Sequence, residues 1–474
     1  MKNKKGFTLI ELLAVIVILA IIALIAVPII MNILNKARQG AAINSAHSYV
    51  KALTLHNAMA DIERSDKKYF SGEYDVTEIN LDNIKGAKPS EGKIIVKNGQ
   101  IEDGTYLCIN NFTLLYKEEN FSVIDNKCSG AQAYYESIIM LDVARRYYTV
   151  DEIKQYIDLL ATKNNSTLQV HFTDDENVGI ELAFLDQTVE NATYSNGVYT
   201  NPVTGKNFLS YDQVKEIIKY AKSKNVEFVP EIDVPAHMNG FFELAINKYG
   251  EDYVRLDNRE DYSIRGIAPG TGDEKGNIDL MVPRAKEFIK NIYDEYTEFF
   301  KAQGCKYFHI GFDEYTYRPE LKKDYINELY NYLSKKDFIV RMWSDALTKE
   351  NISEINKNIE VMYWSYRDGA EYATVPDLQE RGFKVVIGNP YYLFFVPSTD
   401  SITEESLNYA INNIKENWSL EQWQYKENSS LASKTNIIGA IISVWGEDSE
   451  SISSEVIYNQ VEKLFNAMNS KLEF

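Results

Sequence analysis

Short apolar runs alternate with amphipathic helical stretches from Glu136 to the C-terminal residue, and this alternation restricts the fold more than any other feature of the sequence. The apolar runs are Ile138–Leu141, Thr167–Phe172, Val226–Pro230, Tyr307–Ile310, Ile339–Met342, Ile359–Tyr363, Lys384–Ile387 and Ile437–Val444. Helical periodicity fills the gaps, for example in Thr149–Thr162, Tyr211–Lys224, Val282–Gln303 and Glu320–Lys335. Buried strands that alternate with helices form a parallel sheet, and eight such units close a barrel. We therefore predict an α/β fold, a (β/α)8 TIM barrel over residues 136–474.

Polar and aromatic residues stand at or just after the end of each predicted strand. They are Asp142, Arg145, His171, Asp174, Asp175, Glu231, Asp233, His237, Asp313, Glu314, Trp343, Asp345, Trp364, Tyr392, Trp445 and Glu447. Taken singly, each has a structural explanation, such as a core histidine with hydrogen-bond partners or a tryptophan that packs. In a barrel, however, the chemistry sits where the strands end. Carboxylates, an arginine and flat tryptophan faces at one end predict a site for a pyranose.

Two adjacent acids, Asp313 and Glu314, close the apolar run that begins at Lys306. Neighbouring carboxyl groups in different environments can differ in pKa, so that one stays ionised while the other holds a proton. That arrangement suits glycoside hydrolysis. The alternative is a helix N-cap acid followed by a first-turn glutamate, which loops often produce.

The C-terminal two thirds of the chain resemble glycoside hydrolase family 20, the β-N-acetylhexosaminidases, and most of all the dispersin-type enzymes. The stretches that carry the resemblance, in the order of the family, are Asp142–Arg145, His171–Glu176, Pro230–His237, His309–Glu314, Arg341–Trp343, Tyr363–Tyr366, Tyr391–Leu393 and Trp445–Asp448. The resemblance implies a TIM barrel that cleaves β-linked N-acetylglucosamine polymers. For dispersin-type enzymes the substrate is poly-β-1,6-N-acetylglucosamine, a biofilm polysaccharide.

The resemblance also implies a role for each matching residue. Glu314 matches the general acid, and Asp313 the residue that holds the acetamido group of the substrate, whose carbonyl acts as the nucleophile. The substrate-binding residues that it implies are Arg145, Asp174, His237, Tyr317, Trp343, Trp364, Tyr392, Trp445 and Glu447. It implies no cofactor and no metal. This chain departs from the family at Phe312, where a glycine is usual, so the bulky side chain could displace the acid or could point into the barrel wall.

A basic leader, residues 1–6, precedes an apolar stretch over residues 7–31 that is interrupted by Glu11. The stretch is long enough to span a bilayer as a helix, and a lone carboxylate inside it needs a partner. Gly6–Glu11 resembles the processing site of type IV prepilins. The resemblance implies cleavage by a prepilin peptidase after Gly6, methylation of the Phe7 amine, and pairing of Glu11 with that amine in a neighbouring pilin subunit. The alternative is a plain signal anchor.

Residues 32–130 are predicted to complete a pilin of α+β class. Helical spacing continues through Ala41–Ile62, and Tyr74–Ile124 has the pattern of short strands joined by turns. Cys108 and Cys128 bracket the last predicted hairpin, and a disulfide between them would close a loop of about 20 residues and stabilise the unit by about 3 kcal/mol. Residues 131–135 are the predicted linker.

The net charge of −19 argues against a nucleic-acid partner. Three functions remain: a surface-displayed, minor type IV pilin with an active hexosaminidase, a pilus adhesin that binds the same polymer without turnover, and a pilin whose barrel only adds bulk. The expected location is the cell membrane before assembly and the cell surface or pilus afterwards. A domain of this size on every subunit would obstruct a packed filament, so we expect a minor subunit, one that the pilus tip would suit.

Overall fold

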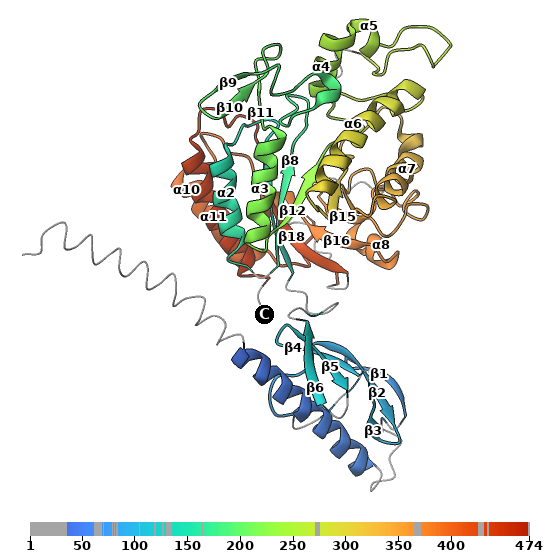
Figure 1. Ribbon diagram of the computed structural model, residues 1–474, viewed down its shortest axis with the longest axis vertical. Helices are drawn as coiled ribbons and strands as arrows, with labels where there is room; N and C mark the ends of the chain where they lie inside the picture. Colours follow the sequence, from blue (N-terminus) through green and yellow to red (C-terminus); the bar gives the residue numbers. More distant parts are fainter. Residues whose placement is uncertain are drawn as a thin grey trace, which may run out of the picture. The chain divides into compact units, whose positions relative to one another are not determined.

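The computed structural model of the chain describes residues 36–472, except 61–68, 70, 78, 80, 82–83, 104, 118–119, 126–127, 129–134, 164, 271–274, 365–370, 425–430 and 434–435. The chain divides into two compact units, residues 1–133 and 134–474 (Figure 1). Gly6, Phe7, Glu11 and the predicted apolar span 7–31 lie outside the described residues. Among the helices that are described, none has both the length and the apolar character needed to cross a bilayer.

The N-terminal unit, here called the head, consists of a helix packed on an antiparallel sheet. Residues 36–60 are helical, and the sheet has the order β1-β2-β4-β5-β6 with β3 paired to β2. The strands are β1 (Gly72–Asp75), β2 (Glu91–Lys97), β3 (Gln100–Ile101), β4 (Tyr106–Ile109), β5 (Phe112–Lys117) and β6 (Asn120–Asp125). This is the helix and the set of short strands that the sequence predicts.

The core of the head follows from the helical period. Ala42, Ala46, Tyr49 and Leu53 recur at spacings of three and four and therefore share one face of the helix. They form a single buried cluster with sheet residues such as Leu107. Cys108 on β4 is disulfide-bonded to Cys128, with their Cα atoms 5.4 Å apart.

The C-terminal unit is a closed barrel of parallel strands, as predicted (Figure 1). Its strands are β7 (Glu136–Asp142), β8 (Ser166–His171), β12 (Glu227–Glu231), β13 (Tyr307–His309), β14 (Ile339–Trp343), β15 (Glu360–Tyr363), β16 (Lys384–Ile387) and β18 (Ile437–Val444). Each pairs in parallel with the next, and β16 pairs with β18 to close the ring. The short β17 (Phe394–Phe395) pairs with β18 at Ser443 and Val444, beyond the residues of β18 that pair with β16.

Helices alternate with the strands along the barrel unit. They are α2 (Val150–Leu160), α3 (Tyr211–Ser223), α4 (Asn239–Tyr249), α5 (Glu251–Val254), α6 (Pro283–Ala302), α7 (Lys322–Ser334), α8 (Val375–Glu380), α9 (Pro390–Leu393), α10 (Glu404–Asn417) and α11 (Ser454–Asn469). Two 3₁₀ turns, η1 (Ala183–Leu185) and η2 (Pro319–Leu321), and a small sheet of β9 (Thr193–Ser195), β10 (Val198–Thr200) and β11 (Asn207–Phe208) complete the unit.

Local sequence determines where several of these helices begin. At the start of α2, the Thr149 hydroxyl accepts from the backbone of Glu152, whose side chain accepts from the backbone of Thr149. The same capping box opens α3, with Ser210 and Gln213. Each box satisfies backbone N–H groups that the first turn of a helix leaves without partners.

The strands have apolar side chains on both faces, because the barrel has an inner and an outer core. On β7, Ile138 and Met140 belong to the cluster inside the barrel, whereas Ile139 and Leu141 pack outward against the helices. At the N-terminal end of the barrel, Arg341 forms buried ion pairs with Glu136 (2.7 Å) and Glu360 (3.0 Å).

Candidate active site

Asp313 and Glu314 come four and five residues after the end of β13, on a segment held by the two neighbouring strand ends. The Phe312 N–H donates to Asp233 Oδ1 at 2.9 Å, and the Glu314 N–H donates to Asp345 Oδ2 at 2.6 Å. Gly311 is needed here, since a Cβ atom at that position would lie 1.7 Å from Asp233 Oδ1. Both Phe312 (φ 72°) and Glu314 (φ 50°) have left-handed backbone conformations, which cost free energy and are typical of functional sites.

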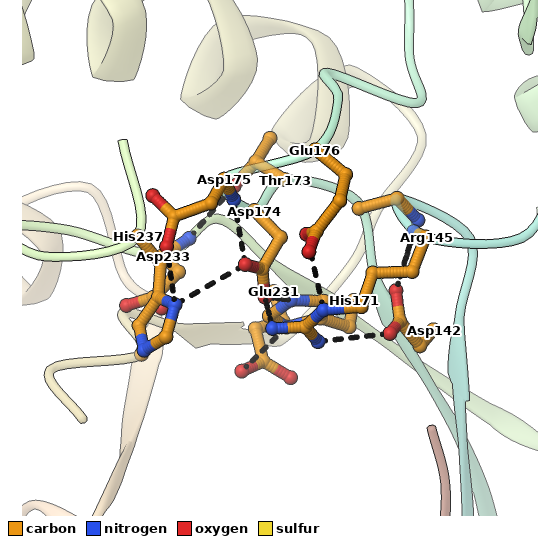
Figure 2. A network of polar contacts seen from close by, with 12 residues as sticks. Asp142, Arg145, His171, Thr173, Asp174, Asp175, Glu176, Glu231, Asp233 and His237 are labelled. Atoms are coloured by element: carbon orange, nitrogen blue, oxygen red, sulfur yellow. Dashed lines mark hydrogen bonds and ion pairs between the residues drawn. The ribbon is translucent and has the colours of Figure 1, made fainter. Parts of the chain in front are cut away.

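His237 connects the two acids to a third carboxylate, that of Asp174. Its Nδ1 lies 3.1 Å from Asp174 Oδ1 (Figure 2). Its Nε2 lies 3.5 Å from Glu314 Oε2 and 3.8 Å from Asp313 Oδ2. Burial alone would lower the pKa of His237, but the charges of Asp174 and Asp313 hold that pKa well above its usual value. The imidazole is therefore positively charged and balances the carboxylates around it.

Glu314 also forms an ion pair with Lys275, whose Nζ lies 2.6 Å from Glu314 Oε2. The contact with His237, opposed by burial and reinforced by Lys275, lowers the pKa of Glu314 to about 2. In this arrangement Glu314 is a carboxylate at neutral pH.

Asp313 is buried beside a second carboxyl group, Asp233. Burial, together with the neighbouring charge of Asp313, raises the pKa of Asp233 well above its ordinary value. Burial raises the pKa of Asp313 as well, whereas the positive charge of His237 opposes that shift. Because two close carboxylates do not both ionise readily, Asp233 takes the proton and Asp313 can carry the negative charge.

Arg145 lies among four carboxylates at the ends of β7, β8 and β18, and Figure 2 shows it with Asp142, Asp174 and Glu176. The guanidinium contacts Asp142 (2.9 Å), Asp174 (2.6 Å), Glu176 (3.1 Å) and Glu447 (3.8 Å). Its Cζ lies 5.5 Å from the centre of the Trp445 ring. A planar fork held in this way can present fixed N–H donors to sugar hydroxyls.

The aromatic residues at this end of the barrel contact one another. Trp343 is fully buried, and its ring centre lies 6.0 Å from that of Trp445. Phe394 lies between the other two tryptophans in sequence and packs against both, at 5.8 Å from Trp445 and 5.9 Å from Trp364. The three predicted tryptophans therefore belong to one aromatic wall.

Glu231 supports this wall from inside the barrel. Its carboxylate accepts from Trp343 Nε1 (2.6 Å) and Gln169 Nε2 (2.7 Å), and it lies 3.0 Å from His171 Nδ1. Burial would raise the pKa of Glu231, but the neighbouring charges of His309 and His171 lower it to about 2. The histidine at position 171 is thus a hydrogen-bonded core residue, the structural explanation that the sequence left open for it.

Several buried polar atoms at this end of the barrel have no hydrogen-bond partner within the part of the chain that the structure describes. They are Tyr392 Oη, Trp445 Nε1 and Glu447 Oε2. Buried polar groups in native proteins are nearly always satisfied, so a cluster of exceptions indicates a place where a polar ligand makes the missing bonds.

The Phe312 side chain points away from these residues. Its ring is fully buried in the outer apolar cluster, with its centre 6.2 Å from that of Tyr315 and 6.3 Å from that of Tyr325 on α7. Of the two orientations that the sequence allowed, the ring adopts the one in the barrel wall.

The contacts connect the predicted site residues except Tyr317 and Tyr392. The described ring contact of Tyr392 is with Tyr391, at 4.8 Å between ring centres. Tyr317 is 37% exposed, and its described contact is with Arg318, whose Cζ lies 4.7 Å from the centre of its ring. Lys275 contacts Glu314, and no pattern in the sequence predicts that Lys275 belongs to the site. The positions of Glu231, Asp233 and Asp345 at strand ends did indicate the site, but the family resemblance implied no role for them.

Two sets of side chains bring possible metal-ligand atoms within 4.8 Å of one another: Asp174, Asp175 and His237, and Asp233, His237 and Asp313. Both sets use His237. Its Nδ1 already lies 3.1 Å from Asp174 and 3.2 Å from Asp175, so we assign these residues to the charge network of the site. The absence of a metal and of a cofactor stays a prediction.

The chain belongs to glycosyl hydrolase family 20, since the model of that family's catalytic domain matches residues 138–319 and 316–459. The prokaryotic N-terminal methylation motif matches residues 1–27. Both resemblances expected from the sequence are confirmed. These matches divide the chain between a prepilin-type N-terminus and a family 20 barrel.

Known proteins and solved structures agree with this division. The chain is 31% identical in sequence to a crystal structure of Dispersin B, with a TM-score of 0.64, covering 71% of this chain and 98% of that one. It is 21% identical to Beta-hexosaminidase 1 of Coccidioides posadasii and 24% identical to Beta-hexosaminidase subunit A1 of Dictyostelium discoideum, covering 66% and 72% of this chain. The chain spans less than 60% of the length of these two relatives, 57% and 59% respectively.

Proposed function

We propose that the barrel is a β-N-acetylhexosaminidase that hydrolyses β-linked N-acetylglucosamine polymers such as poly-β-1,6-N-acetylglucosamine. The observation that carries this proposal is the contact of Asp313 and Glu314 with one imidazole, that of His237, beside the aromatic wall. The resemblance to dispersin-type enzymes supports the choice of polymer.

Catalysis would be substrate-assisted and would retain the anomeric configuration. The 2-acetamido carbonyl oxygen attacks the anomeric carbon while Glu314, in its protonated form, gives a proton to the departing glycosidic oxygen, and an oxazolinium ring results. Asp313 accepts from the acetamido N–H and stabilises its growing positive charge. Glu314, now a carboxylate, takes a proton from the water that attacks the anomeric carbon and reopens the ring.

The remaining residues would bind the sugar. Tyr392 Oη, which has no partner among the described residues, would donate to the acetamido oxygen. Trp343, Trp364 and Trp445 would enclose the N-acetyl group and the ring, and Arg145 with Glu447 would hold ring hydroxyls. Asp174 and His237 would support Glu314, and Tyr317 is assigned a contact with the substrate.

The direct test is release of reducing ends from poly-β-1,6-N-acetylglucosamine by the purified chain. Glu314→Gln keeps the shape of the acid and removes its proton, so hydrolysis should fall by about 10²–10⁴-fold. Equal hydrolysis by both proteins would refute the role of Glu314.

The second candidate function is a pilus adhesin that binds the polymer without cleaving it. It is favoured by the contacts of Glu314 with His237 and Lys275, which keep the proposed acid ionised. The orientation of Phe312 no longer favours it, because the ring lies in the barrel wall. Saturable binding of the polymer with no turnover at any pH would establish the adhesin instead of the enzyme.

We further propose that the barrel is displayed at the cell surface by a minor type IV pilin, assembled from the membrane with other pilin subunits. The methylation motif supports processing by a prepilin peptidase at Gly6 and methylation of Phe7. Glu11 would then pair with the Phe7 amine of a neighbour. Mass spectrometry of sheared surface material should find a mature chain that begins at methylated Phe7, and an intact Met1 would contradict the proposal.

A further inference from the structure

Lys275 brings a positive charge to the general acid from the long segment between β12 and α6. Its Nζ lies 2.6 Å from Glu314 Oε2, with 43% of the lysine and 29% of the glutamate side chain exposed. Its backbone is tied to the same part of the site, because its carbonyl oxygen accepts from the His237 N–H at 2.5 Å.

The neighbouring Gly276 explains how this segment comes so close. Its backbone is left-handed (φ 53°), and a Cβ atom there would lie 2.4 Å from Asp175 Oδ1 and 2.5 Å from the backbone nitrogen of Asn239. Only glycine allows this approach. The lysine is thereby held beside Glu314 by backbone contacts as well as by its charge.

Charged and titratable groups from several elements surround Glu314. His237 and Asp233 stand after β12, Asp313 precedes Glu314, and Asp345 follows β14 and accepts from the Glu314 backbone. Asp174 and Asp175, after β8, act on Lys275 through their charges. Of the two groups that stabilise the ionised form of Glu314, His237 is buried and fully enclosed by acids, whereas Lys275 is the more exposed one and can be replaced with little disturbance.

We propose that Lys275 is a positioning residue that holds the Glu314 carboxylate through this ion pair and thereby sets the upper pH limit of hydrolysis. The inference rests on the proposed function, in which Glu314 is the proton donor. The ion pair with Lys275 requires the ionised form of Glu314, whereas protonation of the leaving oxygen requires the protonated form. One Glu314 side chain cannot be in both forms at once.

The direction in which Lys275 shifts the pH profile follows, because the ion pair stabilises the form of Glu314 that cannot donate a proton. The alkaline limb of kcat/KM reports the ionisation of the acid in the free enzyme. A nearby cation favours the ionised acid and moves this limb to lower pH. Removing the positive charge of Lys275 should therefore move the alkaline limb to higher pH. At pH values on that limb, where kcat/KM of the natural enzyme falls, the variant should hydrolyse the polymer faster.

Nuclear magnetic resonance tests the ion pair without any need for turnover. In the full chain labelled with ¹³C at the glutamate carboxyl carbons, the signal that is missing in Glu314→Gln belongs to Glu314. We expect it to titrate about one pH unit higher in Lys275→Met than in the natural protein, since a partly exposed pair gives the lower end of the effect of a single charge. Identical titration in the two proteins would overturn the inference.

Kinetics test the consequence for hydrolysis. In Lys275→Met, the alkaline limb should move up by about one unit, which corresponds to about tenfold higher kcat/KM on that limb. Lys275→Arg keeps the charge and should leave the limb in place. Lys248→Met is a matched control, because Lys248 forms an ion pair with Asp186 (2.9 Å) and does not contact the site acids. A variant that loses activity equally at every pH would show a merely structural role for Lys275.

Salt provides a measurement on the natural protein itself. Raising the ionic strength screens a partly exposed ion pair, so the limb of the natural enzyme should rise with salt while that of Lys275→Met stays nearly constant. A limb that is independent of salt in both would contradict the inference. If the Glu314 signal shifts as expected but no protein releases reducing ends, the ion pair stands and the proposed function fails.

Discussion

The head and the barrel of this chain bury different kinds of side chain. In the described part of the head, the buried polar residues are the uncharged Ser45, Asn57, Thr105 and Thr113. The barrel buries acids, histidines and arginine, among them Asp174, Glu231, Asp233, His237, Asp313 and Arg341. Burying a charge costs free energy unless partners compensate it, so such groups accumulate where a function requires them. Among the described residues, the buried charges therefore lie in the unit that contains the candidate active site.

The two units also differ in what stabilises them. The head has one small apolar cluster and a disulfide, whereas the barrel has an inner and an outer cluster that leave room for a polar network between strand ends. All five tryptophans lie in the barrel unit, so tryptophan fluorescence reports the barrel alone.

The largest expected effect is the loss of hydrolysis in Asp313→Asn, a change that should affect the chemistry of the barrel and leave the stability of both units nearly unchanged. An amide of the same shape cannot stabilise the positive charge that grows on the acetamido nitrogen, so we expect kcat to fall about 10³-fold. Hydrolysis of the polymer measures the effect, and calorimetry should show thermal unfolding of both units little changed. A variant that keeps full activity would remove Asp313 from the mechanism.

Acidification should lower the free energy of unfolding of the barrel, because it protonates the buried Glu231 carboxylate. Its pKa in the folded barrel is about 2, below the ordinary value of 4.5, so its contribution is present above pH 4.5 and disappears as pH falls towards 2. The difference amounts to roughly 3 kcal/mol. Urea unfolding followed by tryptophan fluorescence between pH 6 and pH 2 measures it.

Glu231→Gln provides the control for that measurement. The amide cannot titrate, so the variant should be less stable than the natural barrel at pH 6 and should lose less stability on acidification. Parallel curves for the two proteins would show that Glu231 is not the group responsible.

Removing the disulfide should affect the head and leave the barrel unchanged. In the double variant Cys108→Ser, Cys128→Ser, a loop of about 20 residues is opened in the unfolded state, which should lower the free energy of unfolding of the head by about 3 kcal/mol. Limited proteolysis should then cut the head faster, while tryptophan fluorescence and hydrolysis stay the same. Cys305→Ser, at a buried free thiol of the barrel, is the control that should spare the head. Equal proteolysis rates for the natural head and the double variant would contradict the expectation.

The smallest effect should come from Phe312→Gly. Deleting a buried phenylalanine costs about 3–5 kcal/mol, but glycine relieves the left-handed backbone and recovers about 1–2 kcal/mol, so the barrel should lose about 2 kcal/mol. Urea unfolding measures this loss. A variant with faster hydrolysis and unchanged stability would instead place the ring in the site.

The barrel strands were predictable because each is a continuous apolar run. Thr167–Phe172 is observed as Ser166–His171, and Ile339–Met342 as Ile339–Trp343, since a strand buried on both faces reads as hydrophobic until its polar end. The site was predictable in part for the same reason. Asp313, Glu314 and Arg145 come three to five residues after the end of a strand, so their position along the chain nearly determines their place in the barrel.

Lys275 was not predictable in this way. It lies in the segment between β12 and α6, where no period and no motif marks it, and it reaches Glu314 because Gly276 allows the backbone to come close. The side of the barrel wall on which the Phe312 ring lies was equally undetermined, because its φ of 72° follows from contacts with Asp233 on a neighbouring strand end.

By itself, the sequence determined the class of fold, the order of the strands along the chain and the residues at their ends, since these depend on local apolar patterning. Only the tertiary structure decided the ionisation of those residues. The pKa of a side chain depends on the charges a few ångströms away, and for Glu314 these belong to His237 and Lys275, which the closed barrel brings together from distant parts of the chain.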